Sequence, residues 1–223
     1  MRMPARFLLL LLCSGTHAVG QPGWFAGAGA GISTLSGDAR SVVGAASTSV
    51  SQYKPENGGL VHLFAGRHWR EYFSTQAVYS WNRNELALLS TRFAGGAETT
   101  YEQARTSRQH NLGADALVYF RSRASFVRPY LAVGAGVMSF DSRATALRIS
   151  KGQPTPPGAA FGSTKIGLRA AAGIDLMLKG GWGIRYAFLE TIQGNPVSER
   201  LSPPGQRGLA NFQNLFGVVK YFR

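Results

Sequence analysis

Cysteine is nearly absent from this chain of 223 residues, which holds Cys13 and no other. Cys13 lies in an N-terminal segment that we expect to be cleaved, so the mature chain would carry no thiol. This excludes disulfide bonds and thiolate metal sites from the mature protein. A lipid anchor on Cys13 is the alternative, but Leu12 stands where lipoprotein signals carry a small residue, so a cleaved signal is favoured.

Long apolar runs are also missing. The stretch from Phe7 to Leu12 is much shorter than the roughly 20 residues that a membrane-spanning helix needs. Two arginines precede it, and small residues of a cleavage pattern follow and end at Gly20. Residues 1–20 are therefore predicted to be a secretory signal peptide, and residues 21–223 to form a single domain.

Acidic residues are few, 11 against 24 lysines and arginines, and the formal net charge is +13. Such a balance fits nucleic acid, an acidic membrane surface or simple solubility. Because the chain is predicted to be exported, nucleic acid is the poorest of these partners and we expect none.

A sustained helical stripe of apolar residues is absent as well, and the repeated signal is alternation with period two. The glycine-rich start "WFAGAGAGIS" fits this pattern better than a nucleotide-binding loop, because its glycines have the wrong spacing and no helix follows. The sequence therefore predicts an all-β protein. Eight strands are expected, over residues 24–35, 60–68, 72–82, 111–120, 127–141, 164–178, 182–190 and 211–222.

The connections between these strands decide the architecture. Short turns at "WREY", "RSRAS" and "LKGGW" alternate with long links over residues 36–59, 83–109, 150–162 and 191–208. Within the second link, residues 92–108 are expected either to lie free or to extend their strands above the membrane. A soluble sandwich has no reason to keep its long loops at one end, whereas an outer-membrane barrel has long outer loops and short periplasmic turns. The pattern favours an eight-stranded antiparallel up-and-down transmembrane β-barrel.

Two local stretches strengthen this interpretation. "RPYLAVGAGV" starts at Arg128, and the chain ends in an amphipathic strand with terminal aromatics, "GVVKYFR". With the strand pattern, they make the chain resemble the eight-stranded outer-membrane β-barrel proteins, the OmpA-like small barrel group. The resemblance implies a monomer in the outer membrane of a Gram-negative-type bacterium. The expected partners are outer-membrane lipid, lipopolysaccharide and, during biogenesis, the barrel assembly machinery, which reads the final strand.

The orientation of the last strand is left open by the pattern. If Phe222 faces lipid, Lys220 does too, near the rim where its long side chain reaches water. The alternative places Leu215, Val219 and Tyr221 on the lipid side.

A barrel of eight strands is only wide enough for side chains to fill its interior or to hold one small ligand. Alternation places five charged residues and one histidine inside, and we expect the charges to pair because an unpaired buried charge is costly. A gated conduction path or a bound anion is the alternative. The predicted network is Asp115, Lys165, Arg169, Asp175, Arg185 and His62.

Aromatic residues tend to end the apolar faces, as in the interfacial girdles of membrane barrels. The predicted interface aromatics are Trp24, Phe73, Trp81, Phe120, Trp182 and Phe188. A soluble lipocalin-like barrel would invert the faces and crowd these rings into its core, so the loop asymmetry and the rings both favour the membrane.

Candidate catalytic and metal residues are sparse. His110 is the one histidine expected at the outer rim, and Ser107 lies at the wrong spacing to share its face. His62 and His68 lack clustered ligands, so no metal site, cofactor or catalytic group is expected.

Basic residues gather in two regions. Those at the short turns are interpreted as a rim that contacts interfacial phosphates, with acidic cell-wall polymers as the alternative. They are Arg67, Arg70, Arg121, Arg123, Arg128 and Lys179. The loop around Arg143, Arg148 and Lys151 continues into the proline-rich "GQPTPPG" and is expected to be exposed, where it would meet lipopolysaccharide phosphates or another surface.

Three functions follow from these observations. The favoured one is a structural or surface-interaction barrel with a filled polar lumen and no catalysis. The alternatives are a small channel or transporter and an enzyme that modifies lipid A.

Overall fold

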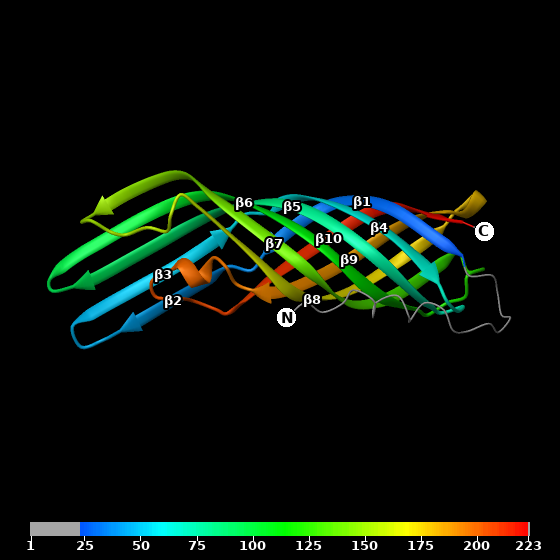
Figure 1. Ribbon diagram of the computed structural model, residues 1–223, viewed down its shortest axis with the longest axis horizontal. Coiled ribbons are helices and arrows are strands. Elements are labelled where there is room, and N and C mark those ends of the chain that lie inside the picture. The colour runs from blue at the N-terminus through cyan, green and yellow to red at the C-terminus, as the bar shows by residue number, and fades with distance from the viewer. Residues whose placement is uncertain (1–22, 223) are drawn as a thin grey trace, which may run out of the picture.

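The computed structural model describes residues 23–222, which form ten antiparallel strands and two single turns of 3-10 helix (Figure 1). The predicted signal peptide, residues 1–20, lies outside this range. The strands are β1 (Trp24–Leu35), β2 (Asp38–Val43), β3 (Ser47–Pro55), β4 (Gly58–His68), β5 (Phe73–Ala94), β6 (Ala97–Tyr119), β7 (Val127–Lys151), β8 (Ala160–Met177), β9 (Trp182–Gly194) and β10 (Gly208–Tyr221). The helical turns are η2 (Lys179–Gly181) and η3 (Ser198–Arg200).

Eight of the strands in the described range close into a barrel. Each pairs with its neighbour in chain order, from β1 to β4 and on to β10, and β10 pairs back with β1. This confirms the predicted all-β, eight-stranded antiparallel up-and-down barrel. The turns after β4, β6 and β8 are short and lie at one end, on the right in Figure 1. No helix of the described chain has the length and apolarity to cross a membrane.

At the other end the sheet projects well beyond the barrel. Strands β5, β6 and β7 have 22, 23 and 25 residues, whereas about 9–11 residues cross a membrane. The link predicted over residues 83–109 is thus mostly paired strand, turned at Gly95 and Gly96 with φ of 58° and 80°. Only glycine adopts such angles readily, which fixes the hairpin at that point.

The link predicted over residues 36–59 is also wrong as a loop, because it forms the hairpin β2–β3. Strand β3 continues along the edge of β5 beyond the end of β4, from Pro55 opposite Leu86 to Ser47 opposite Ala94. The outer half of β5 would otherwise present unpaired N–H and C=O groups on that side, and the run of β-branched and hydroxyl residues in "STSVSQYKP" forms the strand that covers them.

Alternate residues face the lumen and the outside along every barrel strand. In β8, Ile166 and Leu168 are 78% and 68% exposed on the outer face, while Arg169 and Asp175 are buried inside. The last strand follows the same rule with Phe216 and Val218 outside. The structure therefore settles the open orientation of β10: Leu215 and Val219 are buried within the barrel, and Phe222 and Lys220 lie on the outer side.

Lys220 reaches the polar rim from that outer side. Its Nζ donates a hydrogen bond to the carbonyl of Gly180 at 2.7 Å and lies 4.9 Å from the centre of the Trp182 ring. The ammonium thus leaves the lipid face at the short-turn end, as snorkelling requires.

The glycines of "WFAGAGAGIS" face inward and set how closely strands approach. A Cβ atom on Gly31 would lie 1.8 Å from the backbone oxygen of Asn214 in β10. The seam between the first and last strands therefore depends on glycine at this position.

Candidate functional site

The strongest contact in the lumen joins Arg185 to Asp175. These residues lie directly opposite each other on β9 and β8. Arg185 donates from Nε to Asp175 Oδ1 at 2.6 Å and from Nη2 to Oδ2 at 2.8 Å. Asp175 is fully buried and Arg185 nearly so. The two parallel bonds form the planar fork that makes arginine–carboxylate pairs strong and well oriented.

A second pair joins Arg169 to Asp115 across one intervening strand. Arg169 Nε donates to Asp115 Oδ1 at 2.9 Å, although β7 lies between β8 and β6. The residue of β7 between them in register is Gly134. A Cβ on Gly134 would lie 2.3 Å from Asp115 Oδ1, so the absent side chain is what lets the two charges meet.

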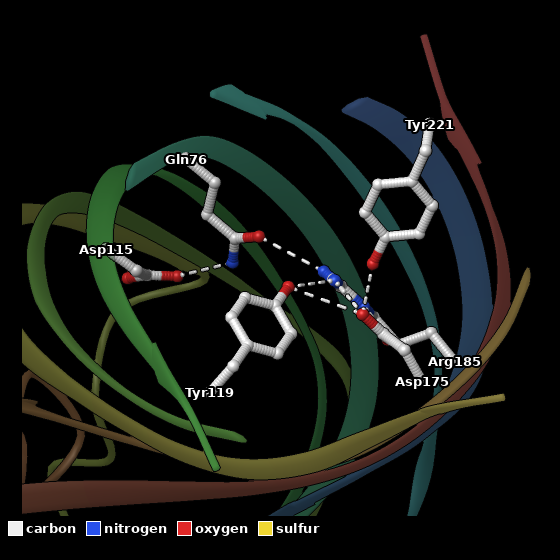
Figure 2. A network of polar contacts seen from close by, with 6 residues as sticks. All are labelled: Gln76, Asp115, Tyr119, Asp175, Arg185 and Tyr221. Carbon is white, nitrogen blue, oxygen red and sulfur yellow. Dashed lines mark hydrogen bonds and ion pairs between the residues drawn. The ribbon is translucent and has the colours of Figure 1, made fainter. Parts of the chain in front are cut away.

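Gln76 links the two pairs into one network (Figure 2). Its amide nitrogen donates to Asp115 Oδ2 and its amide oxygen accepts from Arg185 Nη1, each at 3.1 Å. On the other side, the hydroxyls of Tyr119 and Tyr221 donate to Asp175 Oδ2. Figure 2 shows these groups pointing toward one another within the ring of strands.

The structure brings together four of the six residues that the sequence proposed for this network: Asp115, Arg169, Asp175 and Arg185. His62 lies nearby against Phe64, and its Nδ1 has no hydrogen-bond partner among the described residues. Lys165 is the exception, because it lies near the outer end of β8 and pairs with Glu199 of η3. Alternation predicted correctly that Lys165 is on the inner face of β8. It could not predict how far along the barrel axis the residue lies, or that a loop supplies its partner.

The residues that sequence reasoning missed are Gln76, Tyr119 and Tyr221. All three have the inward spacing. Glutamine is uncharged, however, and the sequence pattern does not distinguish a hydrogen-bonding tyrosine from an apolar or interfacial one. Their role depends on which strands meet across the lumen, which alternation alone does not reveal. Phe64 and Tyr130 also pack on the Arg185 guanidinium, with ring centres at 4.4 and 4.9 Å.

Little space remains at this level of the barrel. The cavity among His62, Asp115, Arg169 and Arg185 has a volume of about 30 Å³. That leaves room for about two water molecules. Toward the outer end follows a layer of neutral amides, where Ser33 donates to Asn211 at 2.7 Å and Asn82 to Asn84 at 2.7 Å.

Above this layer, the segment between β9 and β10 turns into the barrel. Val197 and Leu201 are buried with Leu35, Leu88 and neighbouring residues in one apolar cluster. The sequence predicted only a long link over residues 191–208. In the structure the apolar residues of this link are buried, because the long strands enclose an apolar core at this end. We call residues 195–207 the outer cap.

Asn195 holds the outer cap in place. Its side-chain nitrogen donates to the Tyr53 hydroxyl at 2.7 Å, and its side-chain oxygen accepts from the backbone N–H groups of Val197 and Ser198. Asn195 is fully buried. Tyr53 belongs to the projection outside the membrane, where burial raises the pKa of its phenol despite the Asn195 hydrogen bond, so it stays a neutral hydroxyl.

The six aromatics proposed for the interfaces all lie on the outer face, at two levels. Trp24, Phe73 and Trp182 are the first residues of β1, β5 and β9, and Phe120 follows the end of β6, so these four lie at the short-turn end. Trp81 and Phe188 lie farther along β5 and β9, toward the long loops.

The basic residues proposed for the rim differ in where their side chains point. Arg67 faces outward at the short-turn end, with its guanidinium 4.6 Å from the Trp69 ring centre. Arg128, in contrast, is only 1% exposed and points into the barrel. Its interpretation as a rim residue is wrong, because position 128 shares the inward spacing of Tyr130 and Ala132 on β7.

The histidine candidates lie in unrelated surroundings. His110 faces outward and contacts the Tyr79 hydroxyl through Nδ1 at 2.9 Å, while Ser107 is buried and donates to the Asn84 carbonyl. His68 contacts Ser74, but that serine has no exposed surface. Across residues 23–222, no three His, Cys, Asp or Glu side chains gather as a metal site.

Replacing Asp175 tests the energetic weight of the lumen network. Asp175→Asn leaves the Arg185 charge buried without a partner, and we expect about 3–5 kcal/mol loss in the free energy of unfolding. Asp141→Asn, on the outer face, is the matched control and should change it by less than about 0.5 kcal/mol. The measurement is urea unfolding in detergent micelles. Equal stability of the two variants would contradict this account of the lumen.

Comparisons with known proteins agree with this fold. Residues 5–206 match the family described as outer membrane protein beta-barrel domain. A search of curated proteins gave no match.

Several solved structures are similar over most of the chain. Neisserial surface protein A is 14% identical, with 88% of this chain and 96% of that one covered and a TM-score of 0.48. Ail, the attachment invasion locus protein of Yersinia pestis, is 11% identical over 90% and 99%, with a TM-score of 0.46. The outer membrane protein OprG from Pseudomonas aeruginosa is 12% identical over 90% and 96%, with a TM-score of 0.46.

The family match covers most of the sequence and includes every barrel strand except β10. This chain therefore belongs to the outer membrane protein β-barrel domain family and is a protein of the Gram-negative outer membrane.

Proposed function

We propose that this protein is a non-conducting, non-catalytic surface barrel, which anchors a folded projection outside the outer membrane. The observation that carries the proposal is the filled lumen. Ion pairs, tyrosines and amides occupy the interior at successive levels, and the cavity among the charged groups holds about 30 Å³. The outer cap then buries Val197 and Leu201 at the outer end.

The projection supports a role at the cell surface. It is built from the outer halves of β5, β6 and β7 and from the β2–β3 hairpin, which are joined in one sheet. A sheet of this kind holds its loops in fixed positions, and rigidly presented loops are where proteins commonly bind partners.

We further propose lipopolysaccharide as a lateral partner. Arg83 and Arg108 lie directly opposite each other on the outer faces of β5 and β6, two residues beyond Trp81 and His110. Both are exposed, and neither forms an ion pair with a residue in the range 23–222. Asp141 of β7 lies opposite Arg108 on its other side but forms no ion pair with it. Like charges directly opposite in a sheet repel each other, and a phosphate between the two arginines would relieve that repulsion.

Biogenesis and oligomeric state remain predictions from the family resemblance. The outward side of β10 carries Phe216 and Val218, followed by Phe222, which gives the amphipathic final strand expected for the barrel assembly machinery. We expect the inserted protein to be a monomer.

Planar-bilayer recording tests the non-conducting lumen. Because paired and hydrogen-bonded side chains occupy the lumen, the refolded protein should give no unitary conductance steps. The control Asp175→Ala/Arg185→Ala removes the central ion pair and should show conductance steps that the wild-type protein does not. Stable steps in the wild-type protein that change in Arg169→Ala would overturn the proposal in favour of a channel.

Lipopolysaccharide binding is tested by the double variant Arg83→Gln/Arg108→Gln. Each arginine near an anionic surface contributes about 1 kcal/mol, so the loss of both should weaken binding to lipid A about 30-fold. The readout is titration of lipid A onto refolded protein in a neutral detergent.

The matched control for this titration is Arg70→Gln/Arg121→Gln, which removes the same charge at the short-turn end. It should leave lipid A binding unchanged. If both double variants lose affinity equally, net charge explains the binding and the proposed arginine pair does not.

A further inference from the structure

The short-turn end of the barrel contains a second, much larger cavity. Its volume is about 840 Å³, and it lies among the β6–β7 turn, the β8–β9 turn and the end of β10. A cavity of this size falls within the range that holds small organic ligands. In the outer membrane this end faces the periplasm.

Arg128 lines this cavity and lacks the partners that the other lumen arginines have. Arg169 and Arg185 each pair with a carboxylate. The Nε and Nη2 atoms of Arg128 have no hydrogen-bond partner in the described chain, although the side chain is only 1% exposed. Asp175 lies directly opposite Arg128 on β8, but its ion pair is with Arg185. A buried guanidinium with unused N–H donors is unfavourable, so this position suits an anion.

Aromatic rings compensate for only part of this charge. The Arg128 guanidinium lies 4.1 Å from the ring centre of Tyr119 and 5.6 Å from that of Tyr221. These cation–π contacts hold the arginine in place, but they accept none of its N–H groups. The guanidinium thus keeps donors that suit the oxygens of a carboxylate or a phosphate.

The nearby carboxylates are already engaged. Asp175 accepts the fork of Arg185 and both tyrosine hydroxyls. Glu71 accepts from the backbone N–H of Arg123 and lies 3.9 Å from its Nε. Arg123 and Lys179 also line the cavity, so cations outnumber acids around it.

The remaining walls are largely apolar. Phe126, Met177, Leu178 and Phe222 line the same cavity, and Phe126 and Phe222 are 62% and 49% exposed at its edge. A bare inorganic ion would leave these walls in contact with water. A molecule with one oxyanion and an apolar body would cover them and reach the arginine together.

We propose that this cavity is a binding site for a single-chain amphiphilic anion, with its carboxylate or phosphate on Arg128. Lys179 attracts the anion at the entrance, and the apolar chain lies against Phe126, Met177 and Leu178. The site lies on the periplasmic side of the lumen network and requires no conduction through the barrel, so it stands apart from the proposed surface role.

Ligand-dependent stability tests this site. The full-length mature protein is refolded in dodecyl maltoside, and its unfolding midpoint is followed with added dodecanoate, dodecyl phosphate or inorganic phosphate. A ligand that binds only the folded state raises the midpoint. We expect both amphiphiles to raise it at concentrations at least about 10-fold below those of inorganic phosphate. The amphiphile that binds more tightly distinguishes a fatty-acid carboxylate from a lipid phosphate as the source.

Arg128→Gln is the test variant, and Arg70→Gln, at the same end but outside the cavity, is the control. Loss of charged hydrogen bonds should weaken amphiphile binding at least about 10-fold in Arg128→Gln and leave it unchanged in Arg70→Gln. Since Arg128 is unpaired, Arg128→Gln should fold without ligand, and Arg128→Lys keeps the charge and should retain part of the affinity.

Two results would overturn the proposal. One is an equal rise in midpoint for wild type, Arg70→Gln and Arg128→Gln, which would mean partitioning into the micelle. The other is inorganic phosphate binding as tightly as dodecyl phosphate, which would remove the role of the apolar walls. If Arg128→Gln fails to fold, Lys179→Ser at the entrance takes its place, and unchanged affinity in that variant would equally contradict the site.

Discussion

The hydrocarbon core of a membrane offers no hydrogen-bond partner to a backbone N–H or C=O group, and the architecture of this protein follows from that constraint. A sheet satisfies every such group only when it closes on itself, as this one does through the pairing of β1 with β10. Closure with eight strands leaves a narrow interior. Inward positions therefore favour glycine, packed apolar side chains, and charged groups that find a partner across the lumen.

The charged network meets the need for polar partners inside the narrow lumen. Asp115 and Asp175 each hold an arginine, and Gln76 joins the two pairs. Gly134 contributes by its lack of a side chain, because the Asp115–Arg169 pair crosses its position. Arg128 departs from the rule, and a buried guanidinium without an acceptor is what makes the periplasmic cavity a candidate site. The requirement that buried charges have partners thus explains both the paired charges in the lumen and the proposed anionic ligand.

Much of the barrel could be predicted from the sequence because its rules are local. Period-two alternation placed Ile166 and Leu168 outside and Arg169 and Asp175 inside, as the structure has them. Turn lengths identified the two ends. The projection was predicted in part: residues 92–108 were expected to lie free or to extend their strands, and they extend them, whereas residues 36–59 were interpreted as a link. Their pairing arises from the exposed edge of β5, which is a property of the assembled sheet.

The details of the site depended on distances across the lumen, and no local rule supplies these. Lys165 has the inward spacing of Arg169, yet it meets Glu199 of the outer cap because it lies four residues nearer the outer end. Arg128 was interpreted as a turn residue because it lies next to a short turn. In the structure it is the second residue of β7, and its side chain points into the barrel. The sequence showed the outer cap only as a long link, because its apolar residues are few and are separated by polar ones.

The central claim is that the lumen arginines are sealed within a filled barrel. Solvent exchange of arginine Nε–H protons, measured by NMR on the refolded protein, tests it most directly. The Nε–H protons of Arg185 and Arg169 donate to buried carboxylates and should exchange far more slowly than that of the exposed Arg83. Exchange of all three at the same rate would show water moving freely through the lumen and would contradict the account.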